Sequence, residues 1–275
     1  LAAADAGLST GFAVQNGLGA EPILHYGTED QRRTWLPVIA SGERFCSYAL
    51  TEPDAGSDVA GLKTQGRRGD DGAFTINGNK MWISAGGYAS LFILFARTEG
   101  PGARGISAFI AEPGAGLIVG KEIPKLGLHT SSTVELAFDG YQISADNLLG
   151  SPGQGMQIAL STLDSGRITV AAQAVGIARA ALELATGYAK ERTAFGGPIA
   201  RFQGVQFPLA DVAAKLDAAR ALTLQAAATH DAGEPISVIG AKAKLFASSV
   251  AVEASNVAVQ TLGGMGYSAE FPAER

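Results

Sequence analysis

Hydroxyl, carboxyl and glycine residues gather in one stretch, Thr51 to Gly61, directly after a short apolar run. Thr51 and Ser57 add hydroxyl donors, and Gly56 lets backbone N–H groups approach a ligand closely. Pro53 and the aspartate after it mark a turn. A strand that opens into such a loop is suited to hydrogen-bonding a flat polar ring. From these residues alone an ordinary surface loop is the alternative, because short motifs often occur by chance.

A second stretch, Lys80 to Ser84, carries Trp82 and Ser84 two positions apart. An indole can cover the face of a bound ring and exclude water, and a nearby hydroxyl can hydrogen-bond the ring edge. A tryptophan on a strand is also common in a core, so the spacing leaves both interpretations open.

Further candidates lie on expected helices. Asp164 and Arg167 are three positions apart, so they share a helix face and could form a plain ion pair. Arg192 stands near a helix end before Gly196, which is ordinary helix-end chemistry. The pair Gly263-Gly264 after the last helix is either a C-cap or a place where backbone meets a nucleotide.

Three segments with different composition and residue patterning follow one another along the chain, and they predict an α+β multidomain protein. Residues 1–43 are predicted to be helical, with a capping box between Thr28 and Gln31. Residues 44–150 hold short strands typical of a β-barrel or sandwich, and Asn77-Gly78 predicts a hairpin turn. Residues 151–275 predict a helical bundle. The expected strands are 73–77, 80–84, 91–96, 106–111 and 133–139, and the expected long helices are 154–192, 201–231 and 236–262.

Composition limits the possible functions. The hydrophobic content of 47% supports a sizeable core, and the net charge of −5 gives no case for nucleic acid. No apolar run appears long enough to span a membrane. Cys46 is the single cysteine, so no internal disulfide can form, and we interpret it as a small buried hydrophobe. No targeting signal is visible at Leu1, and both ends look cut from something longer.

Several strings resemble one known family. The stretch YALTEPDAGSDVAG closely resembles the flavin-binding loop of the acyl-CoA dehydrogenases, and ILHYGTEDQ and the ending GGMGY…EFPAER match the same family, nearest to its short-chain, butyryl-CoA-type members. The resemblance runs over essentially the whole chain. It implies N-terminal helices, a central β domain and a C-terminal helical bundle, with FAD as cofactor and acyl-CoA as substrate.

The resemblance also implies roles for single residues. Ser57, Asp164 and Arg167 would bind the substrate, the last two along coenzyme A. Arg192 would reach a neighbouring subunit's FAD pyrophosphate, which implies a homodimer or homotetramer. No catalytic residue is assigned within the chain: Gly166 matches the position of the base in some branches, and the glutamate base is expected after Arg275. The implied cofactor contacts are Tyr48, Leu50, Thr51, Gly56, Ser57, Trp82, Ile83, Ser84, Arg192, Phe195, Gln203, Gln260, Gly263 and Gly264.

The implied reaction is α,β-dehydrogenation of an acyl-CoA thioester to the trans-2-enoyl-CoA, with electrons passed to an electron-transfer flavoprotein. The expected location is the bacterial cytoplasm or the mitochondrial matrix. Three alternatives stay open: an oxidase of the same fold, a non-catalytic homologue that lacks the glutamate base, and a loop for a nucleotide unrelated to flavin. Against the last, the glycine pattern of a Walker or Rossmann loop is not found in strand–helix context.

Overall fold

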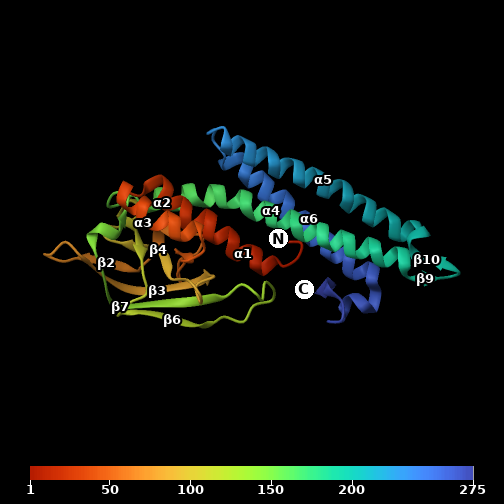
Figure 1. The fold of residues 1–275 in the computed structure, drawn as a ribbon, viewed down its shortest axis with the longest axis horizontal. Coiled ribbons are helices and arrows are strands. Elements are labelled where there is room, and N and C mark those ends of the chain that lie inside the picture. Colours follow the sequence, from red (N-terminus) through yellow and green to blue (C-terminus); the bar gives the residue numbers. More distant parts are fainter. Residues whose placement is uncertain (275) are drawn as a thin grey trace. The chain divides into compact units, whose positions relative to one another are not determined.

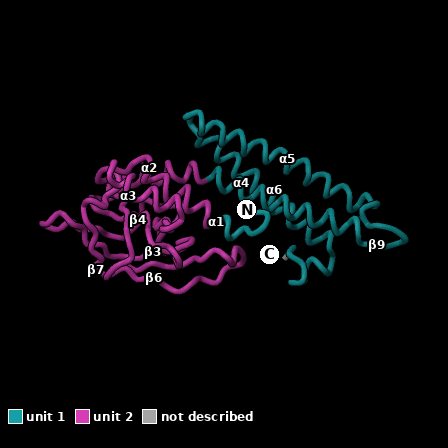
Figure 2. The backbone as a smooth tube through the Cα atoms, in the orientation of Figure 1, with its two compact units in different colours: residues 1–9, 167–275 teal, residues 10–166 magenta. Residues whose placement is uncertain are grey.

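The computed structural model describes residues 1–274, and these fall into two compact units. One unit is Thr10–Gly166, and the other combines Leu1–Ser9 with Arg167–Arg275 (Figure 2). This division is based on packing contacts. The three expected segments, 1–43, 44–150 and 151–275, are based instead on changes in composition and expected secondary structure along the chain. The two differ because the first helices pack on the sheet and because helix α4 contributes residues to both units.

The chain opens with short helices: α1 (Ala6–Ala13), a π-helix (Val14–Ala20), α2 (Glu21–Tyr26) and α3 (Glu29–Ala40) (Figure 1). The expected capping box is confirmed, with Gln31 N donating to Thr28 Oγ1 at 3.1 Å and Thr28 N donating to Gln31 Oε1 at 2.9 Å. The buried Gln15 side chain donates to the carbonyls of Ile39 and Arg44 and accepts from Cys46 N. It thereby fixes the π-helix to the helix and strand that follow.

Eight strands form one mixed sheet. The strand order is β6-β7-β3-β2-β4-β5-β8, and β1 pairs with β4 in parallel. The expected strand 106–111 is confirmed, and the strand expected at 91–96 runs one residue further. The strands are β1 (Cys46–Ala49), β2 (Gln65–Arg68), β3 (Phe74–Ser84), β4 (Leu91–Arg97), β5 (Ile106–Ala111), β6 (Leu117–Glu122), β7 (Thr133–Ile143) and β8 (Leu148–Leu149).

The hairpin expected at Asn77-Gly78 was wrong. Strand β3 continues through both residues, and the turn between β2 and β3 lies earlier, where Gly69 N donates to Ala73 O. A Cβ added to Gly78 would lie 2.7 Å from Thr64 Cα, and the β3–β7 register shifts beside it. Gly78 therefore allows the backbones of β3 and Thr64 to approach closely where the strand is irregular. In sequence, a glycine at such an irregularity cannot be told from a glycine in a turn.

Two apolar cores flank the central strands. Leu91, Ile93 and Phe95 of β4 pack in the core that includes Ile23 and Ile158 from helices. The alternate residues of β4, Phe92 and Leu94, pack instead with residues of β3, β5 and β7. Strands β4 and β5 are therefore buried on both faces, which explains their unbroken apolar sequences. Cys46 is buried as expected, and burial raises the pKa of its thiol to about 12.

Three long helices follow the sheet: α4 (Gly155–Glu191), α5 (Gln203–Asp231) and α6 (Ser237–Leu262). Between α4 and α5 lies a two-strand ladder of β9 (Thr193–Ala194) and β10 (Gly197–Pro198). The helices pack through small residues such as Ala178, Ala219 and Ala247. Small side chains let helix backbones approach closely, as the sequence predicted.

Among the described residues, α4 alone is long and apolar enough to cross a membrane by length and composition. The expectation that no apolar run reaches that length was therefore wrong for this helix. Part of its apolar surface is used within the protein: Ile158 and Ala159 join the sheet core, and Ala171 and Ala178 join the core with α5 and α6, whereas Leu160 and Val170 are exposed. We therefore interpret α4 as a core helix.

Candidate functional site

The loop after β1 and the tryptophan-bearing end of β3 lie side by side. Met81 N donates to Thr51 O at 2.9 Å, and Lys80 Nζ donates to Leu50 O at 3.1 Å. These bonds join two stretches that lie thirty residues apart in sequence. The structure thus brings the Thr51 loop and the Trp82 strand to one place.

The side chains at this place divide into buried and exposed ones. Tyr48, Leu50 and Ile83 are buried, so only their backbone can face a ligand. Trp82 is 52% exposed although it lies on a strand, because Ile83 takes the inward position next to it. Ser84 and Thr51 are half-buried, and Ser57 is exposed. An exposed indole therefore stands beside hydroxyl groups on a rigid sheet.

Gly56 has open space around it. A Cβ built at this glycine would meet no atom within 4 Å. Space of this kind beside Ser57 leaves the loop backbone accessible to a ligand.

A buried ion pair supports the Thr51 loop from below. Glu52 is 5% exposed and Lys80 is fully buried, and their Oε1 and Nζ atoms are 2.8 Å apart. Glu52 also accepts from the backbone N–H groups of Lys63 and Thr64, at 2.6 and 3.0 Å. Burial lowers the pKa of Lys80 to about 8, against the attraction of Glu52. Burial alone would raise the pKa of Glu52, but Lys80 and the backbone donors outweigh it and the pKa lies below its ordinary value.

Sequence reasoning assigned no role to the Lys80 side chain. The available signal was the alternation of β3, in which Phe74, Ile76 and Lys80 are all buried. A lysine at an inward position of a strand requires a buried partner. The only acidic residue of the adjoining Thr51–Pro53 stretch is Glu52.

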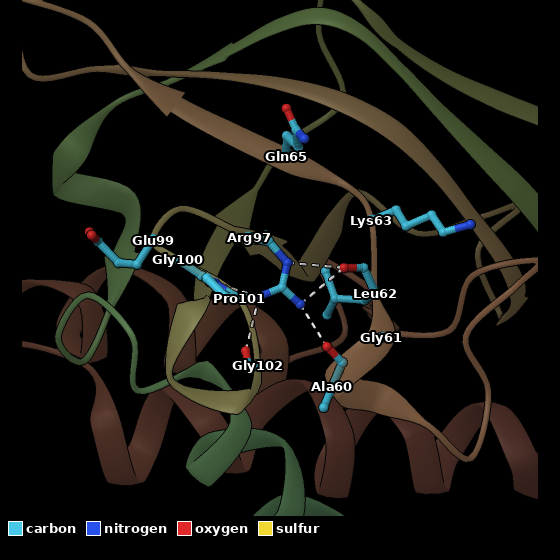
Figure 3. A pocket seen from close by; sticks show the side chains of 10 residues that line it. All are labelled: Ala60, Gly61, Leu62, Lys63, Gln65, Arg97, Glu99, Gly100, Pro101 and Gly102. Atoms are coloured by element: carbon cyan, nitrogen blue, oxygen red, sulfur yellow. Dashed lines mark hydrogen bonds between the residues drawn. The ribbon is translucent and has the colours of Figure 1, made fainter.

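A cavity in the same unit is bordered by loops that Arg97 joins (Figure 3). Its guanidinium donates to the carbonyls of Ala60, Leu62, Gly100 and Gly102 at 2.7–3.2 Å. Arg97 thereby ties together two loops that border a cavity of about 490 Å³. Since its donors go to carbonyl groups, we interpret Arg97 as a loop fastener.

The remaining candidates lie on the helices. Asp164 and Arg167 are half-buried neighbours on α4. Arg192 follows α4 and is exposed, and its carbonyl accepts from Ile199 N across the β9–β10 ladder. Phe195 is 89% exposed with a φ of 51°, and its ring packs edge-on against Phe202.

The last candidates belong to the same unit as Arg192. Gln203 begins α5 and is exposed, and Gln260 lines a groove of about 660 Å³ between α5 and α6. Gly263 ends α6 with a φ of 62°, and neither it nor Gly264 has an atom within 4 Å of a built Cβ. These residues belong to a different unit from the Thr51 loop.

Residues 1–43 match the acyl-CoA dehydrogenase N-terminal domain, 47–141 the middle domain, and 153–275 the C-terminal domain. The chain is also 45% identical over 277 residues to a short-chain specific acyl-CoA dehydrogenase of Megasphaera elsdenii, covering 100% of this chain and 72% of that protein. The chain belongs to the acyl-CoA dehydrogenase family.

Other relatives agree with this assignment. A mitochondrial short-chain specific acyl-CoA dehydrogenase of Bos taurus is 45% identical over 271 residues, which are 97% of this chain and 66% of that protein. The solved butyryl-CoA dehydrogenase of M. elsdenii superposes with a TM-score of 0.99 at 45% identity, over 100% of this chain and 72% of that one. A chain in a solved structure of the electron transferring flavoprotein of Acidaminococcus fermentans superposes with a TM-score of 0.98 at 44% identity, over 100% of this chain and 73% of that one. The expected fold class, N-terminal helices with a central sheet and C-terminal helices, is thereby confirmed.

FAD is the cofactor of this acyl-CoA dehydrogenase family, and the residues present fit it. The exposed face of Trp82 suits a flat ring, and the adjoining Thr51 and Ser84 supply hydroxyls for a polar ring edge. The open space at Gly56 leaves room for the group. The charges of Lys80 and Glu52, which lie next to this place, are buried and paired with each other.

Proposed function

We propose that this protein catalyses the FAD-dependent α,β-dehydrogenation of a short-chain acyl-CoA thioester to the trans-2-enoyl-CoA. The observation that supports this most directly is the hydrogen-bonded pairing of the Thr51 loop with the strand that exposes Trp82. This pairing occurs in a chain that is similar over its whole length to short-chain specific relatives. Electron-transfer flavoprotein is the proposed electron acceptor, on the strength of the A. fermentans structure.

Residues of the sheet unit hold the flavin ring in this proposal. The indole of Trp82 covers one face of the ring and excludes water from it. The hydroxyls of Thr51 and Ser84, with backbone groups of Tyr48, Leu50 and Ile83, hydrogen-bond the ring edge. When bound, FAD supplies the acceptor for the hydride that leaves the β-carbon. Gly56 and Ser57 close the loop over the cofactor, and Ser57 also contacts the substrate.

Residues of the helical unit hold the rest of the cofactor. Arg192 offers two parallel N–H donors to pyrophosphate oxygens, a geometry that a guanidinium provides and an ammonium does not. The exposed ring of Phe195 packs near the adenosine, and Gln203 adds a contact. Gln260, Gly263 and Gly264 approach the adenine or ribose. We propose that these residues serve the FAD of a second copy of the chain, so the active form is a dimer or tetramer.

Asp164 and Arg167 are the proposed contacts for coenzyme A. Asp164 accepts hydrogen bonds from amide or adenine N–H groups, and Arg167 donates. The intervening Gly166 is buried, and a Cβ added there would lie 3.3 Å from Leu18 Cδ2. A catalytic side chain at this helix position is therefore excluded by residue type. Proton abstraction from the α-carbon is assigned to the glutamate that the family resemblance places after Arg275.

The test is the visible spectrum of the purified full-length protein before and after anaerobic addition of butyryl-CoA. We expect a yellow protein whose flavin absorbance bleaches, with longer acyl chains acting more slowly. A protein that stays colourless when FAD is added would refute cofactor binding and favour a non-catalytic homologue. Rapid oxygen consumption with butyryl-CoA would assign the protein as an oxidase instead of a dehydrogenase.

A further inference from the structure

The backbone around Trp82 adopts an unusual conformation. Trp82 and Ala85 have φ angles of 61° and 62°, in the left-handed region. A positive φ is rare for residues other than glycine and is a true outlier for a bulky one. Such strain persists only where surrounding contacts over-determine the backbone, and it tends to occur at functional sites.

A bulge in the sheet accounts for the first of these angles. Lys80 lies opposite Leu136 of β7 and Ile83 lies opposite Val134. Two residues of β3, Met81 and Trp82, therefore face a single residue of β7. The N–H of Met81 is diverted from the β7 ladder to Thr51 O, so the bulge turns this part of β3 toward the Thr51 loop.

Ser47 holds the far side of the bulge. Its side chain is fully buried, and Oγ donates to the main-chain carbonyl of Ser84. Strand β1 pairs with β4 in the sheet. The Ser47 hydroxyl is therefore a side-chain link from β1, which leads directly into the Thr51 loop, to the end of β3.

Ser132 holds the turn that follows. Its carbonyl accepts from Ala85 N at 2.6 Å, and its Oγ accepts from Gly87 N at 3.2 Å. Space beside this turn is tight, since a Cβ added to Gly86 would lie 2.7 Å from Val134 Cγ2. The C-terminal end of the Trp82–Ala85 segment is thus fixed by two serines that lie outside it, whereas its N-terminal side is bonded through Met81 N to Thr51 O.

We propose that Ser47 and Ser132 are positioning residues that hold Trp82 and Ser84 in the geometry required at the flavin ring. This inference rests on the proposed function, which assigns Trp82 and Ser84 to the ring. Neither serine touches the cofactor; each acts through the backbone of residues 84–87. Loss of the Ser47 hydroxyl leaves the Ser84 carbonyl without this donor, and loss of the Ser132 hydroxyl frees Gly87 N while the bond of Ala85 N to the Ser132 carbonyl stays. Each change lets the strained segment relax and displaces the indole.

The test compares Ser47→Ala and Ser132→Ala with Ser107→Ala in the full-length protein. Ser107 is a matched control, because it is a fully buried strand serine whose Oγ bonds Thr98 and Gly153, away from the Trp82 segment. The first readout is amide hydrogen exchange at residues 81–87 in the cofactor-free protein, which does not depend on the proposed function. The second is FAD affinity, together with the shape of the flavin absorption bands.

We expect faster exchange at residues 81–87 in both variants and unchanged exchange there in Ser107→Ala. FAD affinity should fall about 2- to 10-fold, as expected for one hydrogen bond, with altered flavin bands. Ser132→Thr, which keeps the hydroxyl, should restore both the exchange rates and the FAD affinity to wild-type values.

In the alanine variants, exchange at residues 81–87 equal to that of Ser107→Ala would overturn the inference. A wild-type protein that binds no FAD would refute the proposed function instead, and exchange would still decide the role of the serines. Should Ser47→Ala fail to fold, Ser132→Ala decides by the same criteria.

Discussion

Removal of the Lys80 ammonium is the sharpest test of how the Thr51 loop is supported. Lys80 is fully buried, and its Nζ contacts Glu52 Oε1 at 2.8 Å and Leu50 O at 3.1 Å. The substitution Lys80→Met keeps the apolar stem and leaves the Glu52 carboxylate buried with only its two backbone donors. Breaking a buried pair on one side costs about 3–5 kcal/mol, because one charge is left uncompensated.

The assay is urea unfolding followed by tryptophan fluorescence. The chain has two tryptophans, Trp35 and Trp82, and both belong to the Thr10–Gly166 unit, so fluorescence reports on the unit that holds the ion pair. The double variant Glu52→Gln/Lys80→Met removes both charges, and we expect it to recover about 1–3 kcal/mol relative to the sum of the single changes.

Lys63→Met is the matched control. Lys63 pairs with Asp54 at 2.9 Å, but both side chains are mostly exposed. We expect its unfolding midpoint to equal that of the wild type. A Lys80→Met protein that unfolds at the same urea concentration as Lys63→Met would refute the view that the buried pair stabilises the loop.

Two further predictions follow from the same unit. The pKa of Glu52 is lower in the folded state than its ordinary value of 4.5. The contribution of the Glu52 carboxylate to folding stability is therefore present above that pH and is lost as pH falls through the folded pKa. In urea melts taken below about pH 4.5, the stability advantage of the wild type over Glu52→Gln should shrink. Arg97→Lys keeps the charge but not the planar fork that reaches four carbonyls, so we expect faster limited proteolysis within residues 59–62 and 99–105, and equal cleavage rates in variant and wild type would contradict this role.

Local patterns predicted much of the fold. The Thr28–Gln31 capping box, the three long helices and the apolar strands β4 and β5 depend on neighbours in sequence, and the structure confirms them within a few residues. The Asn77-Gly78 turn was wrong because the glycine is required by Thr64, a contact from outside the local sequence. Strand β6 was missed because as an edge strand it is largely exposed and lacks a buried alternation.

The candidate site was only partly readable from sequence. The residue types of the Thr51 loop and the Trp82 strand indicated what each could bind, and resemblance to the family indicated that they act together. What the sequence could not show is how they are joined: the Lys80–Glu52 pair, the bulge at Trp82 and the hydroxyl of Ser47 all depend on contacts across the sheet. Burial of Tyr48 and Ile83 likewise depends on which way each strand faces.

The π-helix at Val14–Ala20 limits how the N-terminal part of this chain can change in length. Gly19 packs so closely on β1 that an added Cβ would lie 2.7 Å from the Cβ of Cys46, and Gln15 is bonded to three main-chain groups from the same side. Deleting one residue here would rotate the side chains of α2 relative to those of α1 by one residue's step, which is about 100° in an α-helix. Insertions and deletions should therefore be tolerated in the exposed loops long before they are tolerated in this helix.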